Sequence, residues 1–163
     1  MLRKNPKSKT KAGGGAFAIV ASCYNARYVD AMVRAAQSEL KRSGVKKIQV
    51  VRVPGAYEIP VVAKRLARLS TLNPQLSAIV CLGVILRGET VHAAHIGEAV
   101  SRALMEIQLA HEIPIVHEVL LLENEGQARV RCLGKKHNRG TEAAQTALAM
   151  ARVMKSLDSE STF

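Results

Sequence analysis

The sequence is poor in aromatic residues and in cysteine, and it contains no long apolar run. Tryptophan is absent, and the aromatic side chains are three tyrosines and two phenylalanines. The cysteines Cys23, Cys81 and Cys132 lie far apart without CxxC spacing, which argues against a disulfide framework and against a zinc site. No segment approaches the ~20 apolar residues of a membrane span. We therefore expect a soluble cytoplasmic protein with reduced thiols and no bound metal.

The composition fits one folded domain with short extensions. Of the 163 residues, 48% are apolar and 23% are charged, and the net charge is +11. Residues 1–15 are basic and end in glycines, so we expect a flexible arm there, the main domain at 16–158 and a tail at 159–163. Residues 16–23 faintly match a lipoprotein export signal ending at Cys23, and they equally match a buried first strand.

Short apolar runs alternate with longer segments of helical periodicity. Strands are expected at 16–22, 47–53, 77–83 and within 113–122, and helices near 29–40, 59–69, 92–110, 124–131 and 141–157. Strands separated by helices pair in parallel, because each crossover returns the chain to the same sheet edge. The sequence thus predicts an α/β protein, a three-layer α/β/α domain with a four-stranded parallel sheet. Ligands bind such sheets beyond the carboxyl ends of the strands.

The segment after the third expected strand, 86–92 (LRGETVH), leads directly into a helix. Free N–H groups at a helix N-terminus, with a glycine and a hydroxyl nearby, can bind an anion such as phosphate. Gly88 and Thr90 are equally consistent with a simple turn and a helix cap. His92 falls in the first helical turn, where the helix dipole disfavours a protonated ring and keeps a base available. A surface histidine without a role is the alternative.

The segment after the second expected strand, 53–60 (VPGAYEIP), places Tyr57 and Glu58 at the start of a helix. Glu58 could stabilise the positive end of that helix, or its carboxylate could bind the hydroxyls of a polyol. The spacing of the residues does not distinguish these two roles. A basic cluster nearer the C-terminus is expected to be a solvated face: Arg129, Arg131, Lys135, Lys136 and Arg139.

Together these segments resemble the lumazine synthase family, over about residues 17–154. The resemblance is carried by VPGAYEIP (53–60), CLGVILRGETVH (81–92) and ENEGQARVRCLGKKHNRG (123–140). It implies a flavodoxin-like sheet and a transferase that condenses 5-amino-6-(D-ribitylamino)uracil with 3,4-dihydroxy-2-butanone 4-phosphate. The product is 6,7-dimethyl-8-ribityllumazine, at the penultimate step of riboflavin biosynthesis, with release of phosphate and water. No metal or redox cofactor is implied.

The resemblance also implies a role for each site residue. His92 is the expected catalytic residue, for proton transfer. Two other sets bind substrate. The ribitylaminouracil is expected to meet Tyr24, Asn25, Ala56, Tyr57, Glu58, Val84, Ile85, Leu86 and His117, and the sugar phosphate Glu89, Thr90 and Arg131. In the family the arginine and the aromatic wall matching His117 come from a neighbouring subunit, so a homo-oligomer is expected.

Three departures from the family pattern concern the site. His117 stands where the family usually has phenylalanine, Leu121 and Leu122 replace a usual pair of threonines, and Ala94 replaces a common acidic residue. The loop 133–140 is poorer in glycine than usual, and it leaves a pentamer and a sixty-subunit shell equally open.

Two other classes of function compete with the enzyme. A flavodoxin-like module that holds a lumazine or flavin without catalysis would share the fold and the pocket. Nucleic-acid binding through the basic arm would show steep salt dependence, but few aromatic residues are available to stack on bases. The positive charge suits a phosphorylated substrate equally well. We expect small-molecule substrates and no nucleic acid or membrane partner, with riboflavin synthase as a candidate protein partner.

Overall fold

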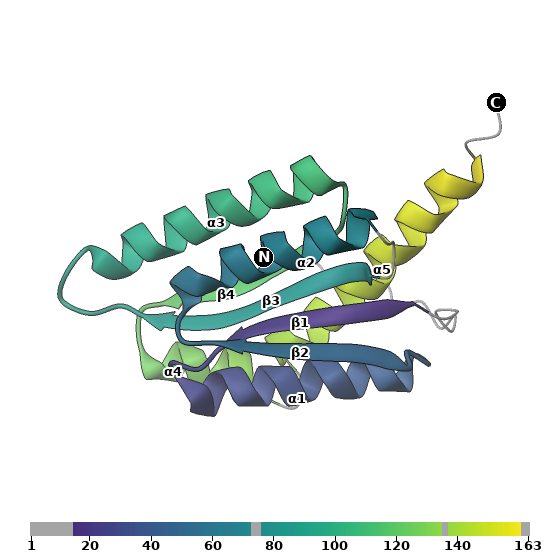
Figure 1. Cartoon of the computed structure of the whole chain (residues 1–163). Coiled ribbons are helices and arrows are strands. Elements are labelled where there is room, and N and C mark those ends of the chain that lie inside the picture. The colour runs from purple at the N-terminus through teal and green to yellow at the C-terminus, as the bar shows by residue number, and fades with distance from the viewer. Residues whose placement is uncertain (1–14, 73–75, 135–136, 161–163) are drawn as a thin grey trace.

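Four parallel strands form the central sheet of this computed structural model, which describes residues 15–72, 76–134 and 137–160 (Figure 1). The strand order is β2-β1-β3-β4. The elements run β1 (Ala16–Ser22), α1 (Ala26–Arg42), β2 (Lys47–Val53), the 3₁₀ turn η1 (Ala56–Glu58), α2 (Ile59–Leu72), β3 (Leu76–Leu86), α3 (His92–His111), β4 (Ile115–Leu122), α4 (Glu125–Ala128), the π-helical turn η2 (Arg129–Leu133) and α5 (Arg139–Glu160). The three-layer parallel α/β/α prediction is confirmed.

Burial follows the position of each strand in the sheet. The central strands β1 and β3 are covered on both faces, and almost every residue in them is buried. Such strands are near-continuous apolar runs, which explains AFAIVA and AIVCLGVI. The edge strand β2 alternates instead between more exposed and less exposed residues. The segment that also matched an export signal forms the buried strand β1.

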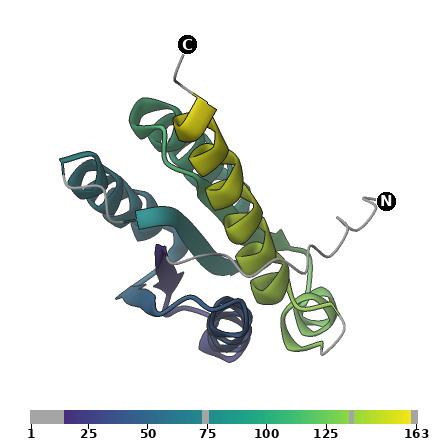
Figure 2. The same ribbon diagram turned by 90° about the vertical axis from the view of Figure 1, so that its right-hand side faces the viewer.

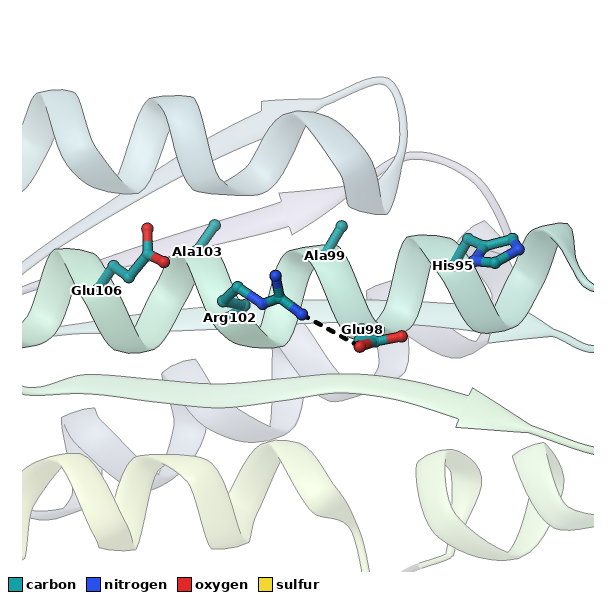
Figure 3. A pocket seen from close by; sticks show the side chains of 6 residues that line it. All are labelled: His95, Glu98, Ala99, Arg102, Ala103 and Glu106. Carbon is teal, nitrogen blue, oxygen red and sulfur yellow. Dashed lines mark hydrogen bonds and ion pairs between the residues drawn. The ribbon is translucent and has the colours of Figure 1, made fainter.

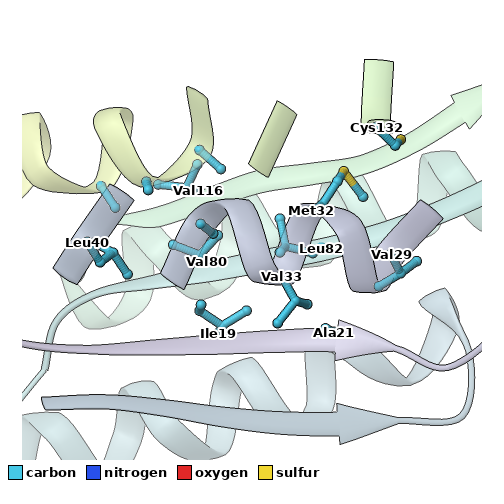
Figure 4. Close-up of a cluster of buried hydrophobic side chains, with 14 of the residues drawn as sticks. Ile19, Ala21, Val29, Met32, Val33, Leu40, Val80, Leu82, Val116 and Cys132 are labelled. Atoms are coloured by element: carbon cyan, nitrogen blue, oxygen red, sulfur yellow. The ribbon is translucent and has the colours of Figure 1, made fainter. Parts of the chain in front are cut away.

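Two apolar cores lie on opposite faces of the sheet. Helices α2 and α3 cover one face, and α1 and α5 cover the other; Figure 2 looks along these layers. On the α1 side, Met32 and Val33 belong to one buried cluster with Ile19 of β1 and with Val80 and Leu82 of β3 (Figure 4). A fully buried aliphatic side chain of this size contributes roughly 1.5–3 kcal/mol. The sheet therefore separates the layer of α2 and α3 from the layer of α1 and α5.

Two positions next to α1 require glycine, one for its backbone conformation and one for close packing. Gly44 ends the helix with φ 90°, a left-handed conformation that glycine adopts without steric cost. Gly140 lies where α5 crosses α1: an added Cβ would come within 2.0 Å of the carbonyl oxygen of Met32. A larger residue at position 140 would push α5 off the core.

Three details differ from the expectations. Strand β3 continues three residues beyond Gly83, the fourth helix continues as η2, and α5 begins at Arg139 and reaches Glu160. The arm expected at 1–15 lies outside the described residues except for Gly15, and the tail expected at 159–163 is described only as the end of α5. Within the described part of the chain, no helix is both long and apolar enough to cross a membrane.

Candidate active site

Three loops converge at the carboxyl edge of the sheet, on the left in Figure 1. The N–H of Cys23 donates to the carbonyl of Val53 at 2.8 Å, and the N–H of Tyr24 donates to the carbonyl of Pro54 at 3.1 Å. The loops after β1 and β2 are thereby joined. Asn25, at φ 54°, donates from Nδ2 to the carbonyl of Val84 at 2.7 Å, which ties them to β3. The structure thus brings these three segments together, as the sequence predicted.

Glu58 is oriented by its own turn. Its Oε2 accepts a hydrogen bond from the N–H of Gly55 at 2.8 Å. This contact supports the helix-start interpretation of Glu58. Among the described residues no hydrogen bond engages its Oε1, which is available to a ligand hydroxyl. The ring of Tyr24 lies against Gly55, where an added Cβ would be 3.1 Å from Cδ2. The adjacent Ala56 is buried, whereas Tyr24 and Tyr57 are 72% and 63% exposed, so both rings are free to contact a ligand.

The end of β3 forms a floor next to these loops. Val84 and Ile85 are buried, and Leu86 is half-buried. The side chains of Val84 and Ile85 point into opposite cores, since successive residues of a strand alternate between faces. Residues 84–86 therefore present mainly backbone groups to a ligand at the sheet edge.

Every residue of the turn from Arg87 to Val91 is exposed, and the turn leads into α3. Thr90 does not cap this helix: the N-cap residue is Val91, and no side chain caps it. The first N–H groups of the helix consequently remain available to an anion. A Cβ on Gly88 would meet no atom within 4 Å, so open space lies beside the turn. His92 is the first residue of α3 and is exposed.

Arg87 joins this turn to the end of β4. Its N–H donates to the carbonyl of Leu122 at 2.8 Å, and its guanidinium pairs with Glu123 at 3.0 Å. Both side chains are about half-exposed, so the ion pair stabilises the turn by at most ~1 kcal/mol.

His117 lies apart from this group. It is in the middle of β4, the far edge strand, and it faces α3, where its Nε2 is 2.8 Å from Oγ of Ser101. Its Nδ1 accepts a hydrogen bond from the N–H of Val119 at 3.1 Å. His117 is exposed as a residue, and partial burial of its ring lowers the pKa. The partnership with Ser101 was not foreseen, because residues 16 apart in sequence meet only once α3 packs on β4.

Arg131 lies on the opposite side of the sheet from His92. It is exposed in η2, and the next residue, Cys132, is buried in the core between α1 and the sheet. Helix α3, which begins at His92, belongs to the other core. In a single chain these two residues thus belong to elements that pack on opposite faces of the sheet.

The basic cluster is only partly a solvated face, which corrects the expectation for Arg139. Its Nε lies 3.2 Å from Glu118, and its Nη1 lies 2.7 Å from Glu142. Arg129 is exposed and pairs weakly with Glu125 at 3.4 Å, and Lys135 and Lys136 lie outside the described residues. Burial raises the pKa of Glu118 to about 7, although Arg139 and Arg131 oppose that shift. The charged neighbour of Arg131 is thus an acid on β4 that sequence patterns did not indicate.

Two surface hollows of the described chain lie away from the converging loops. One of about 340 Å³ runs along α3 between His95 and Glu106, where Glu98 pairs with Arg102 at 3.2 Å (Figure 3). The other, about 570 Å³, lies at the amino end of the sheet, near Lys46 and Ser70. Neither hollow lies beyond the carboxyl ends of the strands, where sheets of this kind bind their ligands.

A parallel α/β/α sheet with polar and aromatic groups at its carboxyl edge, next to an open helix N-terminus, defines a small-molecule-binding α/β protein suited to phosphorylated ligands. The family model described as 6,7-dimethyl-8-ribityllumazine synthase matches residues 14–155, and the chain belongs to this family. A protein of that name from Xanthomonas oryzae pv. oryzae (strain PXO99A) is 39% identical over 143 residues, 86% of this chain and 90% of the relative. One from Stenotrophomonas maltophilia (strain R551-3) is 38% identical over the same shares.

Proposed function

We propose that this chain condenses 5-amino-6-(D-ribitylamino)uracil with 3,4-dihydroxy-2-butanone 4-phosphate to form 6,7-dimethyl-8-ribityllumazine. Membership of the family and the names of the relatives support this reaction. The single structural observation that carries it is the convergence of the β1, β2 and β3 loops, held by the hydrogen bond from Asn25 to Val84. The loops after β2 and β3 hold two of the family motifs, VPGAYEIP and CLGVILRGETVH, and the loop after β1 holds Tyr24 and Asn25.

The carboxyl edge is suited to the uracil substrate. Tyr24 offers an exposed ring for stacking on the pyrimidine, and Glu58, oriented by Gly55, offers a carboxylate oxygen to the ribityl hydroxyls. The remaining residues of this subsite line the ribityl chain of the substrate or present backbone groups to it: Asn25, Ala56, Tyr57, Val84, Ile85 and Leu86.

The turn before α3 is suited to the phosphate. The backbone of Glu89 and Thr90 lies at an uncapped helix N-terminus, where the helix dipole favours negative charge. His92, the first residue of α3, moves protons, because an imidazole can accept and donate a proton near neutral pH. The amine adds to the ketone, water leaves to give an imine, phosphate is eliminated, and ring closure with loss of water completes the product.

We propose further that the active protein is a homo-oligomer whose pockets form between subunits. The sheet separates Arg131 from His92 in one chain, and His117 lies on the far edge strand. A neighbour could supply both residues to the open carboxyl edge. The protein acts in the cytoplasm, where its three free thiols stay reduced, and riboflavin synthase consumes its product.

Incubation of the purified protein with both substrates tests the reaction. Lumazine fluorescence should rise with equimolar release of phosphate, and omission of either substrate should abolish both signals. A binding module without catalysis would bind a coloured lumazine yet release no phosphate. That outcome would refute the proposed function.

Mixed oligomers test the shared pocket. Subunits carrying H92A and subunits carrying R131A, unfolded and refolded together, should recover activity above that of either variant alone, because some pockets then combine an intact His92 with an intact Arg131. Refolding each variant separately is the control. If co-refolding yields only the mean of the two separate activities, both residues act within one chain.

A further inference from the structure

A chain of three hydrogen bonds connects helix α3 to β4 and ends on His117. The hydroxyl of Ser101 donates to the carbonyl of Gly97 at 2.7 Å, and its Oγ is 2.8 Å from Nε2 of His117. On the other side of the ring, the N–H of Val119 donates to Nδ1 at 3.1 Å. Both ring nitrogens of this residue are therefore engaged.

The direction of each bond follows from its donors and acceptors. A backbone N–H only donates, so Nδ1 of His117 must be the bare nitrogen, and the neutral ring carries its proton on Nε2. The Nε2–H then donates to Oγ of Ser101, whose own hydrogen is directed to the carbonyl of Gly97. Every donor in the chain has an acceptor. Protonation of Nδ1 would direct its N–H at the N–H of Val119, and the hydrogen bond between them would be lost.

This arrangement excludes a nucleophilic serine. In a serine–histidine pair that activates the hydroxyl, the ring nitrogen facing Oγ is bare and accepts the hydroxyl proton. Here that nitrogen already carries a proton, and the hydroxyl of Ser101 is committed to its own helix. Burial also lowers the pKa of His117, which favours the neutral ring. The pair is thus suited to holding the ring in place.

We propose that Ser101 is a positioning residue that fixes His117 in one orientation and one tautomer, so that the imidazole meets the uracil substrate through its ring face. The proposal rests on the proposed function, in which His117 forms the aromatic wall of the heterocycle site. With both nitrogens occupied, the ring presents only its face and C–H edges, as a phenyl ring would. A substrate that covers it then desolvates no unpaired polar atom, which would otherwise weaken binding.

Kinetic constants of S101A and S101T for each substrate test this role. S101A should raise KM for the uracil substrate about threefold to tenfold, the net worth of one hydrogen bond, with little change in kcat or in KM for the sugar phosphate. S101T retains the hydroxyl and should stay near the wild type. Alanine is the better helix former, so S101A does not weaken α3.

Two controls separate positioning from a general structural effect. Ser156 makes the same kind of bond back into its helix, to the carbonyl of Val153 at 2.7 Å, so S156A should change neither KM. In an H117F background no ring nitrogen remains to be held, and the effect of S101A should vanish.

Three outcomes would overturn the inference. An unchanged KM in S101A, or an equal rise for both substrates, would show that Ser101 does not orient the uracil wall. A full S101A effect persisting in H117F would show that the hydroxyl acts without His117. A wild-type protein that forms no lumazine would refute the proposed function, and the inference that rests on it would be refuted as well. An active wild type whose KM for the uracil substrate is unchanged by S101A would refute the inference alone.

Discussion

Substitution of Glu118 by glutamine would measure how strongly burial perturbs the carboxylate beside the expected phosphate clamp. The side chain is 13% exposed, and it lies 3.2 Å from Nε of Arg139. The two atoms are buried and not aligned for a hydrogen bond, so the attraction compensates only in part for lost hydration. Burial raises the pKa of Glu118 from 4.5 to about 7, and repulsion from Glu142 adds to the shift, whereas Arg139 and Arg131 oppose it.

A raised carboxyl pKa makes the folded protein less stable as the pH increases. Between the unfolded value of 4.5 and the folded value of about 7, the folded state binds the proton more tightly, so rising pH removes stability through this window. The full shift corresponds to about 3.4 kcal/mol, and the part lost between pH 5 and pH 8 is about 2.5 kcal/mol.

Urea unfolding at pH 5 and pH 8, at one protein concentration, provides the assay. The free energy of unfolding of the wild type, relative to E118Q, should fall by about 2.5 kcal/mol over that interval. Glu106 is exposed on α3, so E106Q should track the wild type at both pH values. If the wild type and E118Q differ by the same amount at pH 5 and pH 8, Glu118 ionises normally, and the reasoning about its burial is wrong.

Three further predictions concern the site. H92A should lower turnover roughly tenfold to a thousandfold with the fold intact, and an unchanged turnover number would remove His92 from the mechanism. R131K should raise KM for the sugar phosphate more than for the uracil, because lysine cannot make the bidentate contact, whereas R129K in the same exposed turn should change neither KM. Light scattering should give at least five times the 17.6 kDa of the chain; a fully active monomer would refute the shared pocket.

The fold was predictable because its signals are local. Strands β1 and β2 have the bounds that apolar runs indicated, and α3 begins at the predicted residue, His92. The end of β3 was not predictable, because Gly83 resembles a strand terminus in sequence. In the structure Gly83 lies inside the strand, where an added Cβ would be 3.1 Å from Cγ1 of Val119. Val119 lies on the neighbouring strand, and Cδ1 of Ile59 on α2 would be 3.3 Å away, so only the assembled fold reveals how closely Gly83 is packed.

The sequence predicted which strand ends form the candidate site. It did not predict which side chains of different elements contact one another. Parallel topology alone places the segments after β1, β2 and β3 at one edge, so their convergence follows from the strand pattern. Long-range pairs have no such pattern. Glu118 meets Arg139 across the junction of β4 and α5, and His117 meets Ser101 across that of β4 and α3. Their spacing carries no periodic signal, so sequence reasoning mistook Arg139 for a solvated residue.

The two faces of β4 explain how one strand can serve two functions. Successive side chains alternate between faces, so His117 turns toward α3, and Glu118 turns toward α5 and the turn that holds Arg131. On one face, hydrogen bonds fix a neutral ring; on the other, a buried carboxylate faces two arginines. A proton added to Glu118 weakens its attraction for Arg131 without touching the His117 network. In the proposed site, acidification should therefore alter the surroundings of Arg131 before it alters the orientation of His117.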